Sequence, residues 1–409
     1  MILPNGLEED LQFLDDESKE IVELLFSTNE DDRLVSAVTL QQLGDEDTIP
    51  FLIHALDDSS TSVQLIAVTS LWEMANEKAV IPLMKCINSK RFEKVREEAC
   101  NALKELINQD HLLKLLDLLE TEDDTQKIYV LILLRKIHDI QALPSIADFL
   151  KSSNPILRKE TLITLRYLNQ LTHYPPAILL ASDPDIDVRK ETMLTLSNFD
   201  EPDILKTLCK SLIEDESWEV RRNAAQALEQ KKDYLSSTFL SKSVSDDHWQ
   251  VRKFSMRALS TIVKEEHLEA IIPKLCDDFS DIRKEAATAL GLIGSEKAIG
   301  ALSQSLNDSD IEVRIASQKA LNKIKRMNCK KVLIHDVARP NTSKKIIKEI
   351  IKKLKNNDAV VPTIKAYDAT KRIDKNLIFK NIKRQTLGFS QTPQGFTFKK
   401  ILKKHFENK

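Results

Sequence analysis

The 409-residue chain is 42% hydrophobic and 30% charged, as expected of a folded protein with a buried core, and it contains only 7 Gly. So few glycines disfavour a phosphate-binding loop, and no apolar run reaches the roughly 18 residues that a membrane span needs. The net charge of −3 conceals a division: residues 325–409 hold 23 basic and 6 acidic side chains, whereas residues 1–324 hold 37 and 57. This asymmetry predicts two parts with different partners or histories.

The first residues and the cysteines indicate a cytoplasmic protein. The opening MILPNGLEEDLQ lacks the basic-then-apolar pattern of a secretory signal. The five cysteines are odd in number, far apart and without a C-x-x-C pair, which favours reduced thiols over disulfides or a zinc site. They are Cys86, Cys100, Cys209, Cys276 and Cys329.

Residues 1–30 are predicted to form a helical N-terminal cap, and a repeat of 31 or 32 residues follows over 31–326. Segments such as EVRRNAAQALEQ and DIRKEAATALGLI carry an aliphatic residue before an Arg and another eight positions later, a spacing typical of one buried helix face. A second amphipathic stretch lies between these helices, and Asp, Ser and Asn clusters follow it as turns and helix N-caps. The sequence therefore predicts about ten helical hairpins that stack into a solenoid.

We call the position after that aliphatic residue the rung, because Arg recurs there as a ladder. The Arg rungs are Arg33, Arg96, Arg158, Arg189, Arg221, Arg252, Arg283 and Arg314, and Gln64 and Lys127 occupy the other two. A basic stripe for an anionic partner is one interpretation. The favoured interpretation is structural: each Arg pairs with an acidic residue or a helix-end carbonyl of the next unit. The array is acidic overall, so we expect no nucleic-acid partner.

Two tryptophans occupy equivalent positions in neighbouring units. Trp218 and Trp249 each lie two residues before the aliphatic residue, so they form a possible surface platform for a base or a peptide, although packing between units is the simpler interpretation. The histidines are scattered without metal-ligand spacing, and we predict no metal site.

The V-R-x-x-A-x-x-A-L signature on this period resembles short HEAT repeats of the phycobilisome-lyase type, over roughly residues 25–326. The resemblance implies a mainly α, HEAT-like solenoid that presents a long surface to a protein partner and needs no cofactor. It also leaves open a lyase-like or chaperone subunit for a tetrapyrrole protein.

The repeat ends near residue 326, and a strand–helix–strand pattern begins. The segment VLIHDVARP, Val332 to Pro340, reads as a strand with charged groups after it. An amphipathic helix and a second strand, Asp358–Ile364, follow it, which predicts a βαβ unit with a parallel sheet. Asp336 and Arg339 would then lie beyond the carboxyl end of the first strand, where a carboxylate and a guanidinium suit a sugar hydroxyl and a phosphate.

Three motifs in residues 330–409, VLIHDVARP, DAVVPTIKAYDATKRID and FSQTPQGF, resemble 2-C-methyl-D-erythritol 4-phosphate cytidylyltransferase, an enzyme of isoprenoid precursor synthesis. The resemblance implies substrate contacts for Asp336 and Arg339, a substrate contact across a dimer for Arg384, and a phosphate contact for Thr392. Ala369 stands where the family has a substrate-binding Thr, so that contact is doubtful. CTP and Mg²⁺ are implied only if this activity is present.

The family's Gly-rich loop and essential Lys, which hold the triphosphate, have no counterpart before Val332, because repeats occupy that stretch. The segment 327–409 is therefore predicted to be a truncated piece of the enzyme without catalytic residues of its own. We expect a protein-binding scaffold with an inactive appendage, so a small-molecule substrate is doubtful. The alternative is a working cytidylyltransferase.

Overall fold

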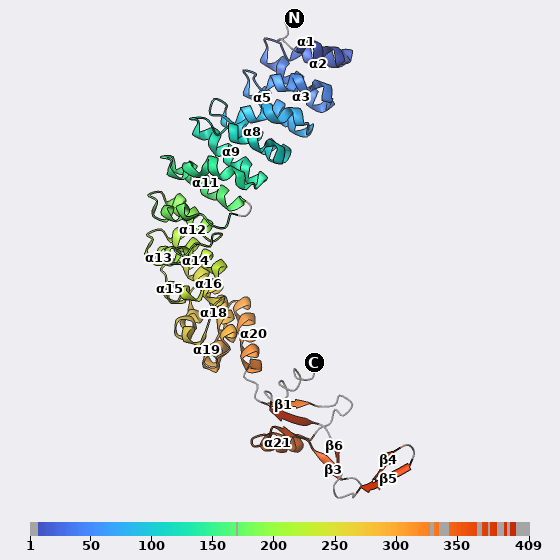
Figure 1. The fold of residues 1–409 in the computed structure, drawn as a ribbon, viewed down its shortest axis with the longest axis vertical. Helices are drawn as coiled ribbons and strands as arrows, with labels where there is room; N and C mark the ends of the chain where they lie inside the picture. Colours follow the sequence, from blue (N-terminus) through green and yellow to red (C-terminus); the bar gives the residue numbers. More distant parts are fainter. Residues whose placement is uncertain are drawn as a thin grey trace. The chain divides into compact units, whose positions relative to one another are not determined.

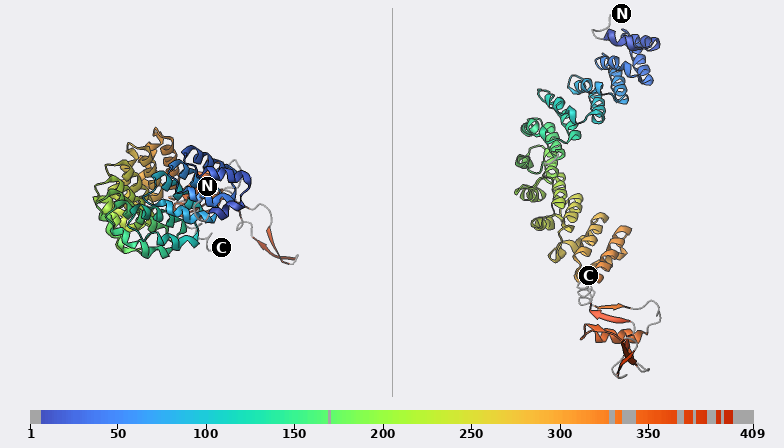
Figure 2. Two further views of the ribbon diagram at one scale, coloured as in Figure 1. Left: turned by 90° about the horizontal axis from the view of Figure 1, so that it is seen from above. Right: turned by 45° about the vertical axis from the view of Figure 1, so that its right-hand side comes forward.

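A computed structural model describes residues 7–168, 171–327, 331–334, 343–365, 370–374, 377–382, 388–390 and 393–397. The chain divides into two compact units, Met1–Ile262 and Val263–Lys409. Within the first unit, helical hairpins follow one another in chain order (Figures 1 and 2). None of the described helices is both long and apolar enough to cross a membrane.

One helix of each hairpin carries the rung, and we call it the B helix. Those of the first unit are α3 (Glu30–Leu43), α5 (Thr61–Glu73), α7 (Glu93–Leu106), α9 (Asp124–Ile137), α11 (Pro155–Tyr167), α12 (Ile186–Leu196), α14 (Trp218–Lys231) and α16 (Trp249–Ser260). Those of the second unit are α18 (Ser280–Ile293) and α20 (Ile311–Met327).

The other half of each hairpin, the A element, is shorter and often begins or ends as a 3₁₀ turn. In the first unit these are α2 (Asp16–Leu24), η2 (Glu46–Thr48) with α4 (Ile49–Ala55), η3 (Glu77–Ala79) with α6 (Val80–Met84) and η4 (Lys85–Ile87), η5 (Gln109–His111) with α8 (Leu112–Asp117), η6 (Ile140–Ala142) with α10 (Leu143–Ile146) and η7 (Ala147–Lys151), η8 (Pro175–Ser182), α13 (Ile204–Glu214), and η9 (Tyr234–Ser236) with α15 (Ser237–Ser243). In the second unit they are η10 (Glu265–His267) with α17 (Leu268–Ile271) and η11 (Ile272–Cys276), and η12 (Glu296–Ala298) with α19 (Ile299–Gln304) and η13 (Ser305–Asn307). The chain begins with α1 (Leu7–Asp10) and η1 (Leu11–Phe13). Because α2 packs on α3, the predicted N-terminal cap supplies the first A element.

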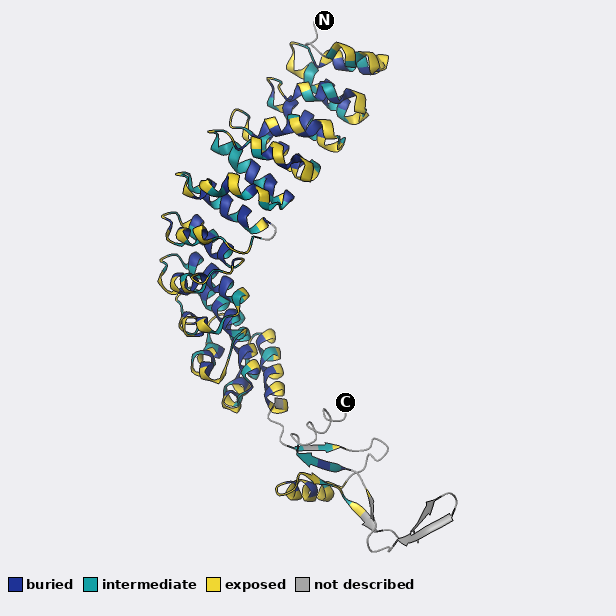
Figure 3. Ribbon diagram, viewed as in Figure 1, coloured by how far each residue is buried: buried dark blue, intermediate teal, exposed yellow. Residues whose placement is uncertain are grey.

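Local sequence explains where the B helices begin and end. Asp123 and Ser217 cap α9 and α14 by accepting backbone N–H bonds, as the Asp and Ser clusters predict. Several helices end on a left-handed residue; this is Gly44 after α3, whereas Ala75, His138 and Lys232 adopt the same conformation with a side chain. Three and seven positions after the rung, every B helix buries a residue, and eight of the ten also bury the residue before the rung (Figure 3).

The last B helix differs from the others on the face that a further unit would cover. Four positions after the rung, the nine B helices from α3 to α18 bury an apolar residue: Ala37, Val68, Cys100, Leu131, Leu162, Met193, Ala225, Met256 and Ala287. In α20 this residue is Gln318, which is exposed and donates a hydrogen bond to Asn322. A polar outer face is what a terminal repeat needs to remain soluble.

The described residues of the C-terminal part form short strands and a helix. They are β1 (Lys331–Ile334), α21 (Lys344–Lys353), β2 (Ala359–Val360), β3 (Thr363–Lys365), β4 (Thr370–Asp374), β5 (Leu377–Ile382), β6 (Gly388–Ser390) and β7 (Gln394–Thr397). The sheet order is β1-β7-β2, and β3–β6 and β4–β5 form separate pairs. Helix α21 lies against β7, where a Cβ on Gly395 would overlap Ile350 and come within 2.7 Å of Leu354.

The mainly α architecture with a small α/β end is thus confirmed, but the expected parallel pairing is wrong for the described strands. Both β1 and β2 pair antiparallel with β7, which lies between them, so they run in the same direction without touching. The second predicted strand is divided by Pro362 into β2 and β3, which lie in different sheets. Proline donates no backbone hydrogen bond, so a strand tends to stop there.

Candidate functional site

The rung arginines form a hydrogen-bonded connection between successive units. In the complete case, Arg221 donates from Nε and Nη2 to the two carboxylate oxygens of Asp246, at 2.7 and 2.9 Å. Its Nη1 donates to the carbonyl oxygens of Asp215 and Glu216, in the loop before its own helix. Asp246 also accepts the backbone N–H of His248. One guanidinium therefore joins the loop of its own unit to the loop of the next.

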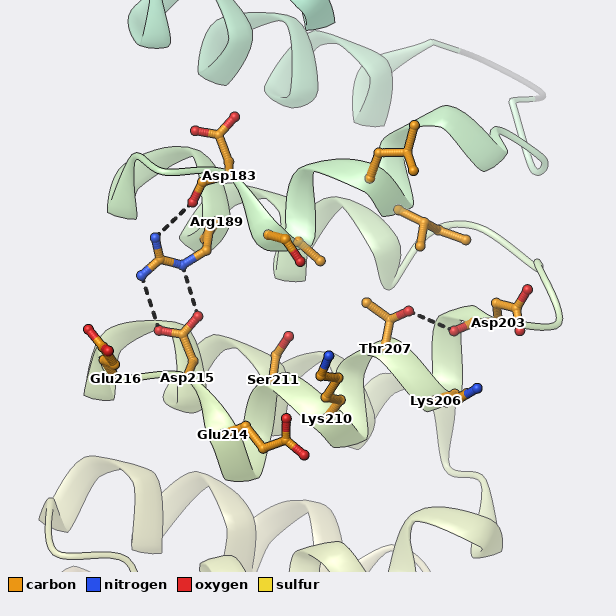
Figure 4. Close-up of a pocket in the computed structure, with 14 residues that line it drawn as sticks. Asp183, Arg189, Asp203, Lys206, Thr207, Lys210, Ser211, Glu214, Asp215 and Glu216 are labelled. Atoms are coloured by element: carbon orange, nitrogen blue, oxygen red, sulfur yellow. Dashed lines mark hydrogen bonds and ion pairs between the residues drawn. The ribbon is translucent and has the colours of Figure 1, made fainter.

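This arrangement, which we call the bridge, recurs with nearly constant spacing. The bridges are Arg33–Asp58, Arg158–Asp183, Arg189–Asp215, Arg221–Asp246 and Arg283–Asp308. Figure 4 shows the Arg189–Asp215 bridge and the bond from Arg189 to the carbonyl of Asp183. This geometry supports the structural interpretation of the ladder, with one difference of detail: the next unit supplies the carboxylate, and the carbonyls belong to the Arg's own unit.

The bridges explain the charge state of their members. Hydrogen bonding to the neighbouring Asp raises the pKa of Arg189, Arg221 and Arg283. Hydrogen bonding from Arg283 lowers the pKa of Asp308 although burial opposes the shift. The guanidinium charges are thus balanced within the array, which is a poor basis for binding a polyanion.

Two further rung arginines also donate to carbonyls in the loop before their own helix. Arg252 donates to the carbonyls of Asp246 and Asp247, and Arg314 to those of Asp308 and Ser309. Gln64 donates to the carbonyl of Asp58. Arg96 donates to the carbonyl of Arg91, and Lys127 forms an ion pair with Asp124 of its own helix at 3.8 Å.

The ring of His248 packs against both tryptophans: it stacks on Trp218 at 3.7 Å between centroids and lies 6.3 Å from the ring of Trp249. The guanidinium of Arg222 lies over the ring of Trp218, 5.5 Å from its centroid. All three rings are half-buried, and burial lowers the pKa of His248. By sequence alone, His248 was considered only as a possible metal ligand. Its position next to two equivalent tryptophans was the signal that would have identified it.

A hollow of about 860 Å³ opens between η8 and α13 (Figure 4). One wall is apolar and includes Leu179, which is 79% exposed, and the other is the polar face of α13 with Lys206 and Lys210. Thr207 donates its hydroxyl to the carbonyl of Asp203 in its own helix. This hollow offers a binding groove without a paired nucleophile and base.

Of the described cysteines, Cys276 is exposed, whereas Cys86, Cys100 and Cys209 are buried. Burial raises the pKa of Cys86, Cys100 and Cys209 to about 11, so these thiols are protonated and unreactive at neutral pH. No group of three or more His, Cys, Asp or Glu among the described residues could hold a metal ion.

The four substrate contacts inferred for the C-terminal part cannot be placed. Asp336, Arg339, Arg384 and Thr392 all lie outside the described residues, and their roles stay predictions. The domain limits at residues 30 and 326 also stay predictions.

Comparisons with known proteins distinguish the two parts of the chain. A family model for 2-C-methyl-D-erythritol 4-phosphate cytidylyltransferase (IspD) matches residues 312–409. The bifunctional enzyme IspD/IspF of Pelagibacter ubique is 43% identical over 86 residues, which are 21% of this chain and 23% of that protein. The cytidylyltransferase of Shouchella clausii is 33% identical over 78 residues, 19% of this chain and 34% of that protein. The chain thus spans about a fifth to a third of the length of these relatives.

The remainder matches a repeat family. Yeast importin-β (Kap95p) shares the fold, with a TM-score of 0.54 and 12% identity over 78% of this chain and 53% of that chain. Kap95p determined with RanGDP gives the same TM-score over 80% and 54%. A HEAT-repeat family model matches residues 18–104, 174–247 and 236–322, which together make up more than half of the chain. The chain therefore belongs to the HEAT-repeat family and carries a C-terminal segment similar to part of IspD.

Proposed function

We propose that this protein is an interaction scaffold whose HEAT array binds a protein partner. The observation that carries the proposal is the recurring bridge, since it fixes one hairpin to the next and holds a row of helix surfaces in register. Such a surface suits a macromolecule, which contacts many units at once. The solved structures of Kap95p with RanGDP and with Nup1 lend support, because that solenoid of similar fold binds other proteins.

The scaffold proposal is tested with the tagged full-length chain. Proteins retained from the source cells after crosslinking are identified, purified separately and titrated into the chain by isothermal calorimetry. We expect one protein to bind with a defined stoichiometry and micromolar or tighter affinity. A set of retained proteins none of which binds in the purified system would contradict the proposal.

We further propose that the C-terminal segment lacks cytidylyltransferase activity. The array occupies residues up to 327, where the family's triphosphate-binding loop would have to precede β1, and the match covers a minor share of the relatives. Without backbone donors and a cation for the triphosphate, CTP binding is unfavourable. CTP and Mg²⁺ would be bound only if the segment were an active transferase.

The alternative, an active transferase, is favoured by the 43% identity to the Pelagibacter ubique enzyme. It is tested by pyrophosphate release from CTP with methylerythritol phosphate and Mg²⁺, using the full chain and its Asp336→Ala variant. We expect no release above the enzyme-free rate from either protein. Turnover by the wild-type chain that disappears in the variant would establish the transferase and overturn the proposal of inactivity.

A further inference from the structure

Four successive B helices carry an uncharged polar residue at one equivalent position, nine residues after the rung. These residues are Tyr167, Asn198, Gln230 and Thr261, on or directly after α11, α12, α14 and α16. At the same position the other units have Gln42, Glu73, Glu105, Lys136, Leu292 and Lys323. A row of hydrogen-bonding groups without charge is therefore concentrated in this part of the first unit.

The row coincides with two adjoining hollows on the B-helix surface. One, of about 260 Å³, is lined by Tyr167, Leu194 and Asn198 among others, and the second, of about 610 Å³, by Phe254 and Thr261. Gln226 and Gln230 of α14 line both. We call the combined surface the amide groove.

The charges of the amide groove are largely paired within the protein. Arg166 binds Glu191 at 2.5 Å, and Arg257 binds Glu229 at 2.8 Å. Arg257 also lies over the ring of Phe254. Lys232 adds one cation at the rim. A nucleic acid requires a clear excess of cations along its backbone, which the lining does not offer.

The amides, in contrast, are available. Gln226 and Gln230 lie one turn apart on α14, and within the described part of the chain neither side chain makes a hydrogen bond. Each carboxamide presents one acceptor oxygen and a donor NH₂ group, the complement of a peptide unit's N–H and C=O. Tyr167 is 45% exposed although its ring lies 5.8 Å from that of His138, and its exposed surface can pack against an apolar side chain.

We propose that the amide groove binds an extended segment of a partner protein, recognised through its backbone by Asn198, Gln226 and Gln230. This inference rests on the proposed scaffold function and names its binding surface. Four helices packed about 8–10 Å apart span about 25–30 Å, which an extended strand covers with roughly eight or nine residues. An apolar side chain of that segment would pack between Tyr167 and Leu194.

The probe for this inference is a displayed library of random 12-residue peptides selected on the full-length chain. Enriched peptides are labelled and titrated by fluorescence polarisation against the wild type and a Gln226→Ala/Gln230→Ala variant. We expect affinity to fall at least about tenfold in this variant, as for the central contacts of an interface. Gln230→Glu keeps the size of the side chain but removes its donor, and we expect it to weaken binding at least about threefold.

The matched control is Gln42→Ala, which removes an amide at the equivalent position of α3 and is expected to leave affinity unchanged. Circular dichroism melts identify any variant that does not fold. Peptides that bind all variants equally, or no enrichment at all, would overturn the amide groove. If binding is instead lost in Leu179→Ser, at the hollow between η8 and α13, the groove is wrong but the scaffold proposal survives. A labelled 20-nucleotide single strand is tested as a competitor. If it displaces the peptides and its own binding is lost when Gln226 is replaced, the ligand of the groove is a nucleic acid and not a peptide.

Discussion

The array contains a bridged region and an unbridged region that share one fold. Bridges recur between Arg158 and Asp308, whereas between Gln64 and Ser152 none of the described residues forms one. The loops facing the unbridged rungs carry Asn88, Thr121 and Ser152 where the bridged loops carry Asp. These side chains still accept the backbone N–H two residues later, at 3.0–3.1 Å, as the Asp residues do.

The comparison separates two tasks of the loop residue. Capping the next helix needs only an oxygen acceptor, so Asn, Thr, Ser and Asp are interchangeable for it. Joining two units needs a carboxylate that matches the planar guanidinium fork, so both partners must be present. Arg96 shows the result when one is missing: its Nε is buried without a hydrogen-bond partner, because Thr121 occupies the place of the Asp.

The largest expected effect comes from removing a bridge. Asp183→Asn keeps the acceptor for the Asp185 N–H but leaves the Arg158 guanidinium, which is 10% exposed, without its counter-charge. We expect the stability of this part of the array to fall by about 3 kcal/mol. Urea unfolding and amide exchange in α11 and α12 measure it.

The control for that experiment is Ser152→Ala in the unbridged region, where only a cap to Asn154 is lost and about 1 kcal/mol is expected. Equal losses in the two variants would show that the bridge adds nothing to the cap.

The second effect comes from building a bridge where one is missing. Thr121→Asp would supply a carboxylate to Arg96 and still accept the Asp123 N–H. We expect stabilisation of about 1–2 kcal/mol, because a buried donor gains a charged acceptor. Chemical unfolding measures it. Ser152→Asp would place a carboxylate in the loop that corresponds to the Lys127 rung. The lysine ammonium cannot form the paired hydrogen bonds of a guanidinium, so we expect this variant to be stabilised by less than about 0.5 kcal/mol.

The third effect is a dependence of stability on pH that arises at a bridge carboxylate. The pKa of Asp308 is lowered in the folded protein from the ordinary 3.8, so its stabilisation is complete above that value and is lost as the pH falls through the lowered pKa. The difference in unfolding free energy between wild type and Asp308→Asn should be constant from about pH 7 to 5 and shrink below about pH 4. A difference that grew on acidification would contradict the assignment.

The smallest effect should be independent of bridging. Ala75, after α5 in the unbridged region, and Lys232, after α14 in the bridged region, both have positive φ angles, of 49° and 51°. Ala75→Gly and Lys232→Gly should each stabilise the array by about 0.5 kcal/mol, because glycine adopts this conformation without strain. Thermal unfolding of both variants measures the effect, and a gain in only one region would point to a difference in backbone geometry.

Local pattern was sufficient to predict the B helices and the hairpin layout, since the rung and the apolar spacing repeat in every unit. For the bridges, the sequence predicted only that each arginine would pair with an acidic residue or a carbonyl. It did not show that Arg221 pairs with Asp246, which lies 25 residues later in the chain. In the C-terminal part, β1, α21 and β2 follow from periodicity, whereas β7 between the two strands does not. Strand order depends on contacts between residues that are distant in the sequence. The glycine at position 395 allows β7 to pack closely against α21, but the sequence does not show which element it contacts.

The candidate site was predictable to a lesser degree. The row of Tyr167, Asn198, Gln230 and Thr261 can be read from the repeat once the rung is fixed, but its meaning depends on hollows that only the packed helices create. His248 between the tryptophans could have been found by aligning the units and comparing ring positions.

The exposed Gln318 of α20 also has a consequence for self-association. An apolar side chain there would present a surface resembling the interior of the array, to which the first hairpin of another copy could add head to tail. Such contacts do not close on themselves and lead to open filaments. Gln318 is hydrogen-bonded to Asn322 and presents a polar group on this face of the last hairpin. Binding of a second copy here would require that this polar group be desolvated, which is unfavourable. We therefore expect an apolar substitution of Gln318 to favour head-to-tail association of the protein.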